Sequence, residues 1–265
     1  MRHSKHFETT TLVKAGVPVL LTGERGCGKT TLAKDVSADL DIPFFSMSMT
    51  RQTTLSHLLG FMNVNGVYIP SQLRTAAENG GLFLLDEVDA SDPNVILCLN
   101  TIENGYIAFP DMVVEIHENF RLMATSNPQG GHREYVGRAK LDAATLDRFD
   151  IIDVLKDDIL EKSLVDFHTY SNMELVRKCL KEVNSPTYIS MRDSIRFQKR
   201  KDLDLLDSFV DRLLKNDRMA LEKYEELKDS IPKVSNVKEC KTLLDVWDHV
   251  SSSKTSTPHE DDTPF

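Results

Sequence analysis

Short apolar runs alternate with amphipathic stretches along the first part of the chain. Four runs have the character of strands that are buried on both faces of a parallel sheet: Val17–Thr22, Ile42–Ser48, Gly81–Asp86 and Phe120–Asn127. Between the first two runs, an apolar residue recurs every four positions and predicts a helix, at Leu32, Val36 and Leu40. After the third run, Asp92 and Pro93 have the order of a helix N-cap and first helical position, and Gly105 ends the predicted helix. Strands that alternate with helices indicate an α/β fold with a parallel sheet between helices.

Helical patterns replace strand patterns from about residue 157 onward. Ser171 and Glu174 have the spacing of a capping box in front of an apolar stripe. Two further amphipathic stripes follow: Leu203, Leu206, Phe209, Val210, Leu213 and Leu214, and then Val237, Cys240, Leu243, Leu244 and Trp247. We therefore expect an α/β domain over residues 1–155 and a smaller all-helical domain over residues 156–250. Residues 251–265 form an acidic tail that is predicted to be disordered, because it has too little apolar surface to pack.

Composition and charge exclude several classes of protein. The chain has 265 residues, of which 40% are hydrophobic, so it can bury a substantial core. Its net charge of −9, from 32 basic and 41 acidic residues, disfavours sequence-independent binding to duplex DNA. Its apolar runs are far shorter than the roughly 20 residues that span a bilayer, and its first residues lack the apolar core of a signal peptide. The four cysteines lack metal-ligand spacing, so we expect a cytoplasmic protein with reduced thiols.

A glycine-rich loop stands between the first predicted strand and the first predicted helix. Residues 23–30 read Gly-Glu-Arg-Gly-Cys-Gly-Lys-Thr and match the pattern GxxxxGK[ST]. In such a loop, backbone N–H groups surround the β-phosphate, the lysine reaches the β- and γ-phosphates, and the hydroxyl binds magnesium. We expect nucleotide contacts from Gly23, Glu24, Arg25, Gly26, Cys27, Gly28, Lys29, Thr30 and Thr31, with Thr30 also a magnesium ligand. The alternative is a glycine-rich turn with an ordinary surface lysine.

Two carboxylates follow the third apolar run directly. Asp86 and Glu87 end the stretch Leu-Phe-Leu-Leu-Asp-Glu, at the edge of the sheet where the glycine-rich loop is also expected. Beside a phosphate loop, Asp86 would hold Mg²⁺ through its water shell and Glu87 would act as the general base on the attacking water. The alternative is that the pair begins a solvated loop before Asp89 and Asp92.

Two more polar residues stand near the end of the α/β pattern. Asn127 follows the fourth apolar run, where its amide would orient the attacking water or contact the γ-phosphate, although Asn127-Pro128 alone is a turn signal. Arg148 would stabilise the charge that develops in phosphoryl transfer, and it would come from a neighbouring subunit. The alternative for Arg148 is a salt bridge to Asp147 or Asp150.

The order of these motifs resembles an AAA+ ATPase, and within that class the helix-2-insert group with the MoxR-type ATPases and the small ATPase subunit of cobaltochelatase. The similarity covers residues 16–153, and stretches 58–81, 99–105 and 135–141 support the subgroup. It implies a P-loop AAA+ core followed by a helical lid, with ATP and Mg²⁺ as cofactors. It also implies these roles: Lys29 and Thr30 in Walker A, Asp86 and Glu87 in Walker B, Asn127 as sensor 1, and Arg148 as an arginine finger acting in trans.

The resemblance extends more weakly into the helical part. Residues 190–193 read Ser-Met-Arg-Asp and are similar to the Ser-Pro-Arg that begins a lid helix in the family, which makes Arg192 the candidate for sensor 2. The proline of that motif is missing here. A solvent-facing helix arginine is the alternative for Arg192.

Two predicted hairpins correspond to the inserts with which such proteins contact their clients. Residues 61–69 place Asn65-Gly66 at a turn and correspond to the helix-2 insert. Phe61, Met62 and Tyr68 would grip a client polypeptide, or they would pack beneath the hairpin and stabilise it. A second hairpin is predicted over residues 109–120, and its acidic residues argue against a wedge that grips DNA.

The resemblance implies a remodelling motor that assembles as a ring, expected to be a hexamer, and acts on a protein client. In the family, the partner is often a separate protein with a von Willebrand factor A domain. The alternative is a motor or loader that acts on nucleic acid, for which the basic cluster is His132, Arg133, Arg138 and Lys140. A small-molecule kinase fits Asn127, Arg148 and the helical lid poorly. The sequence lacks the [NT]KxD segment that recognises guanine, so ATP is the expected nucleotide.

Overall fold

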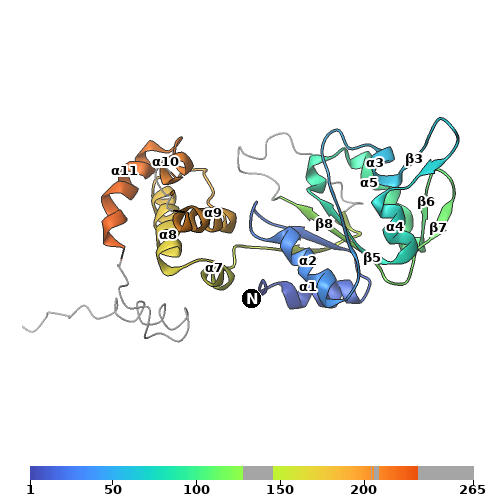
Figure 1. The fold of residues 1–265 in the computed structure, drawn as a ribbon, viewed down its shortest axis with the longest axis horizontal. Helices are drawn as coiled ribbons and strands as arrows, with labels where there is room; N and C mark the ends of the chain where they lie inside the picture. Colours follow the sequence, from blue (N-terminus) through green and yellow to red (C-terminus); the bar gives the residue numbers. More distant parts are fainter. Residues whose placement is uncertain (128–145, 204, 206–208, 232–265) are drawn as a thin grey trace, which may run out of the picture. The chain divides into compact units, whose positions relative to one another are not determined.

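The structure, a computed structural model, describes residues 1–127, 146–203, 205 and 209–231 (Figure 1). It divides into two compact units, Arg2–Asp157 and a second that begins at Asp158. Some predictions lie outside the described residues: the basic cluster 132–140, the stretch 135–145, Leu206, the stripe 237–247 and the tail 251–265. Among the described helices, none is long and apolar enough to cross a membrane.

Five parallel strands form the central sheet of the first unit, in the order β2-β5-β8-β1-β9. Their bounds are Val19–Thr22 (β1), Phe44–Ser48 (β2), Gly81–Asp86 (β5), Phe120–Ser126 (β8) and Asp150–Asp153 (β9). The predicted parallel α/β sheet is confirmed. The apolar pattern did not predict β9, because aspartates occupy both of its ends and only Ile152 is buried.

Helices cover both faces of this sheet, as expected for strands that are apolar on both sides (Figure 1). On one face, α1 (His6–Lys14) and α2 (Lys29–Asp39) pack against the side chains of Val19 and Leu21. On the other face, α3 (Leu55–Leu59), α4 (Gln72–Asn79) and α5 (Pro93–Ile96) share a core with Leu20. The helix predicted after Asp92 is α5, which continues as the 3₁₀ helix η2 (Leu97–Asn104), and Gly105 ends it with a φ of 81°.

Two small hairpins extend from the first unit. The hairpin of β3 (Phe61–Met62) and β4 (Tyr68–Ile69) lies where the sequence predicts it. The second hairpin consists of β6 (Tyr106–Ala108) and β7 (Val113–Glu115), so the prediction of a hairpin over 109–120 is wrong in its bounds. Residues 109–112 form its turn, in which the N–H of Phe109 donates to the carbonyl of Met112.

Helices make up the described part of the second unit: α7 (Asp158–Leu164), α8 (Phe167–Glu182), α9 (Met191–Asp202), α10 (Phe209–Leu213), α11 (Arg218–Leu227) and η4 (Lys228–Ser230). Met173, Val176, Phe197 and Leu214 lie at the centre of their core. The capping box predicted at residues 171–174 is wrong, because α8 begins one turn earlier. Asp166 caps it and accepts a hydrogen bond of 2.7 Å from the N–H of Thr169.

Candidate functional site

Polar residues gather where the central strands of the sheet end. Thr22 ends β1, Asp86 ends β5, and Thr125 and Ser126 end β8, with Asn127 directly after them. Because these strands are parallel and adjacent, their carboxyl ends lie at one edge of the sheet. Such an edge is where open α/β sheets bind ligands.

The glycine-rich loop joins β1 to α2 at this edge. Gly28, directly before α2, has a φ of 102°, in the left-handed region that favours glycine. A Cβ on Gly23 would lie 2.1 Å from the carbonyl oxygen of Val154, so another residue would not fit there. Within the described structure no side chain caps α2 and its first turn holds no acidic residue, so the N–H groups of that turn are available to an anion.

Lys29 is buried, which contradicts the alternative of an ordinary surface lysine. Its Nζ donates to the carbonyl oxygens of Gly23 (2.5 Å) and Glu24 (3.0 Å) and lies 3.4 Å from Oδ1 of Asn127. Burial lowers the pKa of Lys29, against the opposing effect of nearby groups, among them Asp86. A buried ammonium that is held mainly by carbonyl oxygens suits a negatively charged ligand.

Cys27 lies beside this lysine, with Sγ 3.9 Å from Nζ of Lys29. The thiol is buried, and burial raises its pKa. Reactive cysteines are exposed and have a lowered pKa, so Cys27 has the environment of a structural residue. Of the other loop residues, Arg25 and Thr31 are exposed.

Asp86 is held by two hydroxyl groups. Oγ1 of Thr30 lies 3.1 and 3.3 Å from its carboxylate oxygens, and Oγ1 of Thr125 donates to Oδ1 at 2.5 Å. Carboxylate and hydroxyl oxygens are the ligands that Mg²⁺ prefers, so Thr30 and Asp86 fit such an ion. Glu87 is exposed and has a φ of 58°, which turns the chain away from the line of β5.

Asn127 links the loop to the acidic segment. Its side chain lies beside Lys29, and its backbone N–H donates to Oδ1 of Asp89 at 3.4 Å. Asp89 is buried, whereas the sequence suggested it only as part of a solvated loop. The 3₁₀ turn η1 (Val88–Ala90) folds Asp89 back into the protein, and a run of aspartates does not signal such a turn.

A pocket of about 490 Å³ opens beside these residues. Gly23, Glu24 and Asn127 give it a polar side, while Ile151 and Leu155 give it an apolar side. Its volume lies in the range of small-ligand sites.

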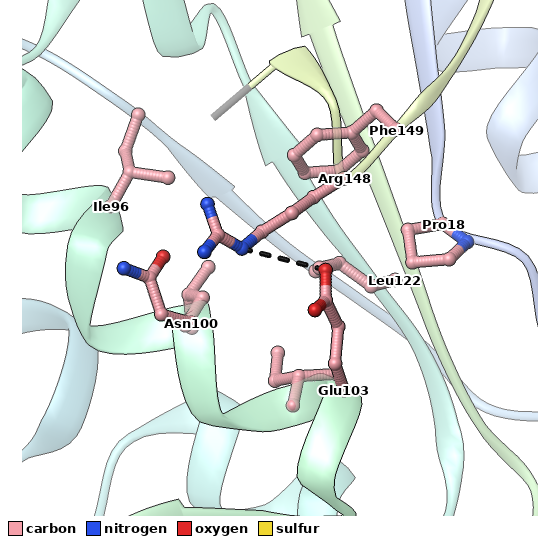
Figure 2. Close-up of a pocket in the computed structure, with 9 residues that line it drawn as sticks. Pro18, Ile96, Asn100, Glu103, Leu122, Arg148 and Phe149 are labelled. Atoms are coloured by element: carbon pink, nitrogen blue, oxygen red, sulfur yellow. Dashed lines mark ion pairs between the residues drawn. The ribbon is translucent and has the colours of Figure 1, made fainter. Parts of the chain in front are cut away.

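Arg148 lines a different, smaller pocket (Figure 2). Its Nε lies 3.5 Å from Oε1 of Glu103 on η2, and its side chain is 27% exposed. Sequence reasoning offered Asp147 or Asp150 as ion-pair partners and did not find Glu103, because the two charges are far apart in the chain. Arg148 therefore lies apart from the cluster of Lys29 and Asn127.

Arg192 belongs to the second unit. It is the second residue of α9, it is exposed, and Ser190 and Asp193 form a capping box around it. Its role as sensor 2 stays a prediction.

The sheet order and the glycine-rich loop place the first unit among the P-loop nucleotide-binding domains. Residues 18–149 match the AAA domain of the dynein-related subfamily, so this unit of the chain is an AAA domain. The chain is 29% identical over 150 residues to Midasin of Giardia intestinalis, a match that covers 53% of this chain and 3% of that protein.

Two further proteins are similar to this chain over more than half of its length. An uncharacterized protein of Staphylococcus aureus is 26% identical over 193 residues, which cover 62% of this chain and 70% of that protein. The solved structure of NtrX from Brucella abortus is similar with a TM-score of 0.50 and 16% identity, covering 86% of this chain and 62% of NtrX. At that identity the similarity shows the fold alone.

Proposed function

We propose that the chain hydrolyses ATP with Mg²⁺ as a remodelling motor of the MoxR-like, helix-2-insert group. The observation that carries the proposal is the contact of three separate segments at the sheet edge. Lys29 contacts Asn127, and Thr30 contacts Asp86, so the loop, β5 and β8 meet where phosphates would lie.

Each side chain has a part in the proposed reaction. Thr30 and Asp86 would hold Mg²⁺, and this ion would neutralise phosphate charge when bound. Lys29 exchanges its carbonyl partners for the β- and γ-phosphates. Glu87 accepts the proton of the attacking water, and Asn127 orients that water.

We propose that the active site is completed between subunits of a ring, with a hexamer as the expected assembly. In this arrangement Arg148 acts on the nucleotide of the neighbouring subunit. Its place in a separate pocket, away from Lys29, supports action in trans over action in cis.

A protein client is supported by the hairpin of β3 and β4. Phe61 and Met62 are 48% and 44% exposed, and residues 52–73 contain no Asp, Glu, Lys or Arg. Tyr68 packs instead: its hydroxyl donates to the carbonyl of Leu59 at 2.7 Å, and the guanidinium of Arg74 lies 5.3 Å from its ring centre. The hairpin is thus anchored and presents an uncharged, apolar surface, which suits a polypeptide better than the phosphates of nucleic acid. A separate protein with a von Willebrand factor A domain is the partner we propose.

The proposal is tested by the steady-state rate of ATP hydrolysis per subunit across a range of protein concentrations. We expect Glu87→Gln to bind ATP and to hydrolyse it about 10²- to 10⁴-fold more slowly. Lys29→Ala should lose ATP binding, whereas Lys34→Ala, an exposed lysine on the same helix, should not. Wild-type turnover in Glu87→Gln, or unchanged ATP affinity in Lys29→Ala, would contradict the assignments.

A further inference from the structure

Thr125 is a fully buried residue that the proposed function has not used. It lies in β8, two residues before Asn127, and is paired in register with Leu21 of β1. Its neighbour Ala124 is paired with Leu85 of β5. This position puts the hydroxyl of Thr125 beside the end of β5, where the two acidic residues stand.

The hydroxyl of Thr125 contacts both acidic residues. Oγ1 donates to Oδ1 of Asp86 at 2.5 Å and accepts from the backbone N–H of Glu87 at 2.9 Å. A threonine hydroxyl has one hydrogen to donate and lone pairs to accept with. Serine has the same capacity, whereas valine has the same shape and can form neither bond.

Thr125 is a partner of Asp86 that has no proposed contact with the nucleotide. The carboxylate of Asp86 contacts the hydroxyls of Thr30 and Thr125. In the proposed function Thr30 would hold Mg²⁺ together with Asp86, so the hydroxyl of Thr30 would also serve the ion. Thr125 belongs to β8 and not to the glycine-rich loop, so its bond to Asp86 can persist through the cycle.

For Glu87, Thr125 holds the backbone. A φ of 58° is an uncommon conformation for a residue with a Cβ, and it persists only where the surroundings fix it. Two backbone hydrogen bonds hold this segment. The N–H of Met49 donates to the carbonyl of Asp86 (2.7 Å), and the N–H of Ala90 donates to the carbonyl of Glu87 (2.9 Å). The hydroxyl of Thr125 adds a side-chain acceptor for the N–H of Glu87 between these two bonds.

We propose that Thr125 is a positioning residue, which fixes the carboxylate of Asp86 for Mg²⁺ and the backbone bend that directs Glu87 toward the attacking water. This inference rests on the proposed ATPase function. Thr125 joins β8, which Asn127 follows, to the acidic pair through one hydroxyl group, so that β8 positions both the proposed γ-phosphate contact and the proposed general base.

The test compares Thr125→Val with Thr125→Ser in the full chain. We expect Thr125→Val to lower kcat about 10- to 100-fold, the usual effect of removing a partner that orients a metal ligand. The Mg²⁺ concentration for half-maximal rate should rise, while the Kd for a fluorescent ATP analogue without Mg²⁺ stays within about twofold. Thr125→Ser should recover most of the rate.

Thr9→Val is the matched control. Thr9 is a buried threonine of the same unit, but its hydroxyl donates to the carbonyl of Lys5 within α1 (2.8 Å), so kcat and the Mg²⁺ dependence should not change. If Thr125→Val does not fold, judged by its thermal transition, Thr125→Ala carries the same expectation.

Two outcomes separate the inference from the function on which it rests. A wild-type chain without ATP hydrolysis overturns the proposed function. An active wild type, an inactive Glu87→Gln and a Thr125→Val with the wild-type rate and Mg²⁺ dependence overturn only the role of Thr125. Equal loss of rate in the serine and valine variants would also contradict it, because shape and not the hydroxyl would then matter.

Discussion

Each unit holds a cation that is at least partly removed from solvent, Lys29 buried and Arg177 half-buried, but the two are surrounded differently. In the helical unit, Arg177 donates to both oxygens of Glu161 (3.1 and 2.6 Å) and to Glu174 (2.6 Å), and Glu161 also accepts from the hydroxyl of Ser194. In the AAA domain, the bonds of Lys29 run to backbone carbonyls and to an amide oxygen. One cation is neutralised by carboxylates in contact with it, and the other is not.

The pKa shifts of the two cations express this difference. Burial opposes the charge of Arg177, but the hydrogen bonds that it donates to Glu161 and Glu174 outweigh this effect and raise its pKa. Burial also opposes the charge of Lys29, and here the surrounding groups do not outweigh it, so its pKa is lowered. A cation whose charge is balanced by carboxylates in contact with it links helices. A buried cation at a sheet edge whose charge is not balanced in this way indicates a site for an anion.

The largest effect on activity is expected at Arg148, whose partly exposed side chain is paired with Glu103 and lies outside the cluster of Lys29. Its pair with Glu103 is partly exposed, so Arg148→Ala should change the free energy of unfolding by less than about 1 kcal/mol. As an arginine finger it should nevertheless lower kcat by about a thousandfold. The measurement is ATP hydrolysis alongside urea unfolding.

Mixing variants decides whether Arg148 acts in trans. Mixing Arg148→Ala with Glu87→Gln should recover activity, because some interfaces then contain both intact groups. Glu103→Gln is the control, since it removes the partner of Arg148 and should keep the rate within a few-fold. An inactive mixture would indicate that Arg148 acts in cis or only supports the structure.

The next largest effect is expected on the free energy of unfolding, when the ion pair of Glu161 and Arg177 is removed. Glu161 is buried, and Glu161→Gln leaves the half-buried Arg177 without its full countercharge, which should lower the free energy of unfolding of the helical unit by about 3–5 kcal/mol. Glu222→Gln, an exposed carboxylate on α11, should change it by less than about 0.5 kcal/mol. Urea unfolding followed by a probe in each unit checks both. Equal effects of the two variants would show that the Glu161 pair is not the main support of this unit.

The sequence predicted features that depend on near neighbours in the chain. The apolar runs identified four of the five strands of the sheet, and the glycine-rich loop and the acidic pair predicted a candidate site at the edge of the sheet. It did not reveal β9, whose single buried residue, Ile152, leaves no pattern.

The features it missed join distant segments. Thr125 reads as an ordinary strand residue until β5 is placed beside it, and its bonds cross 38 and 39 positions of the chain. Glu161 and Arg177 lie on different helices, so no helical spacing marks them as a pair. The capping box of α8 was misplaced because Asp166 and Ser171 are both good cap residues, and only the packing of Phe167 and Tyr170 in the core shows where the helix begins.

The smallest effect is expected at the cap of α8, and it depends on pH. Burial opposes ionisation of Asp166, but hydrogen bonds from Lys201 and Thr169 outweigh it and hold its pKa at about 2, below the ordinary value of 3.8. A carboxyl group with a lowered pKa in the folded state stabilises that state above its unfolded pKa and loses this contribution as the pH falls.

Asp166→Ala should therefore lower the free energy of unfolding of the helical unit by about 1 kcal/mol at pH 7. The difference between wild type and variant should shrink between about pH 4 and pH 2, because Asp166 is then protonated in both the folded and the unfolded chain. Asp166→Asn keeps a cap acceptor but loses the charge that faces Lys201, so it should be less destabilised at pH 7 and show little of this pH dependence. A wild-type-to-alanine difference that stays constant down to pH 2 would assign the effect to the cap hydrogen bond alone.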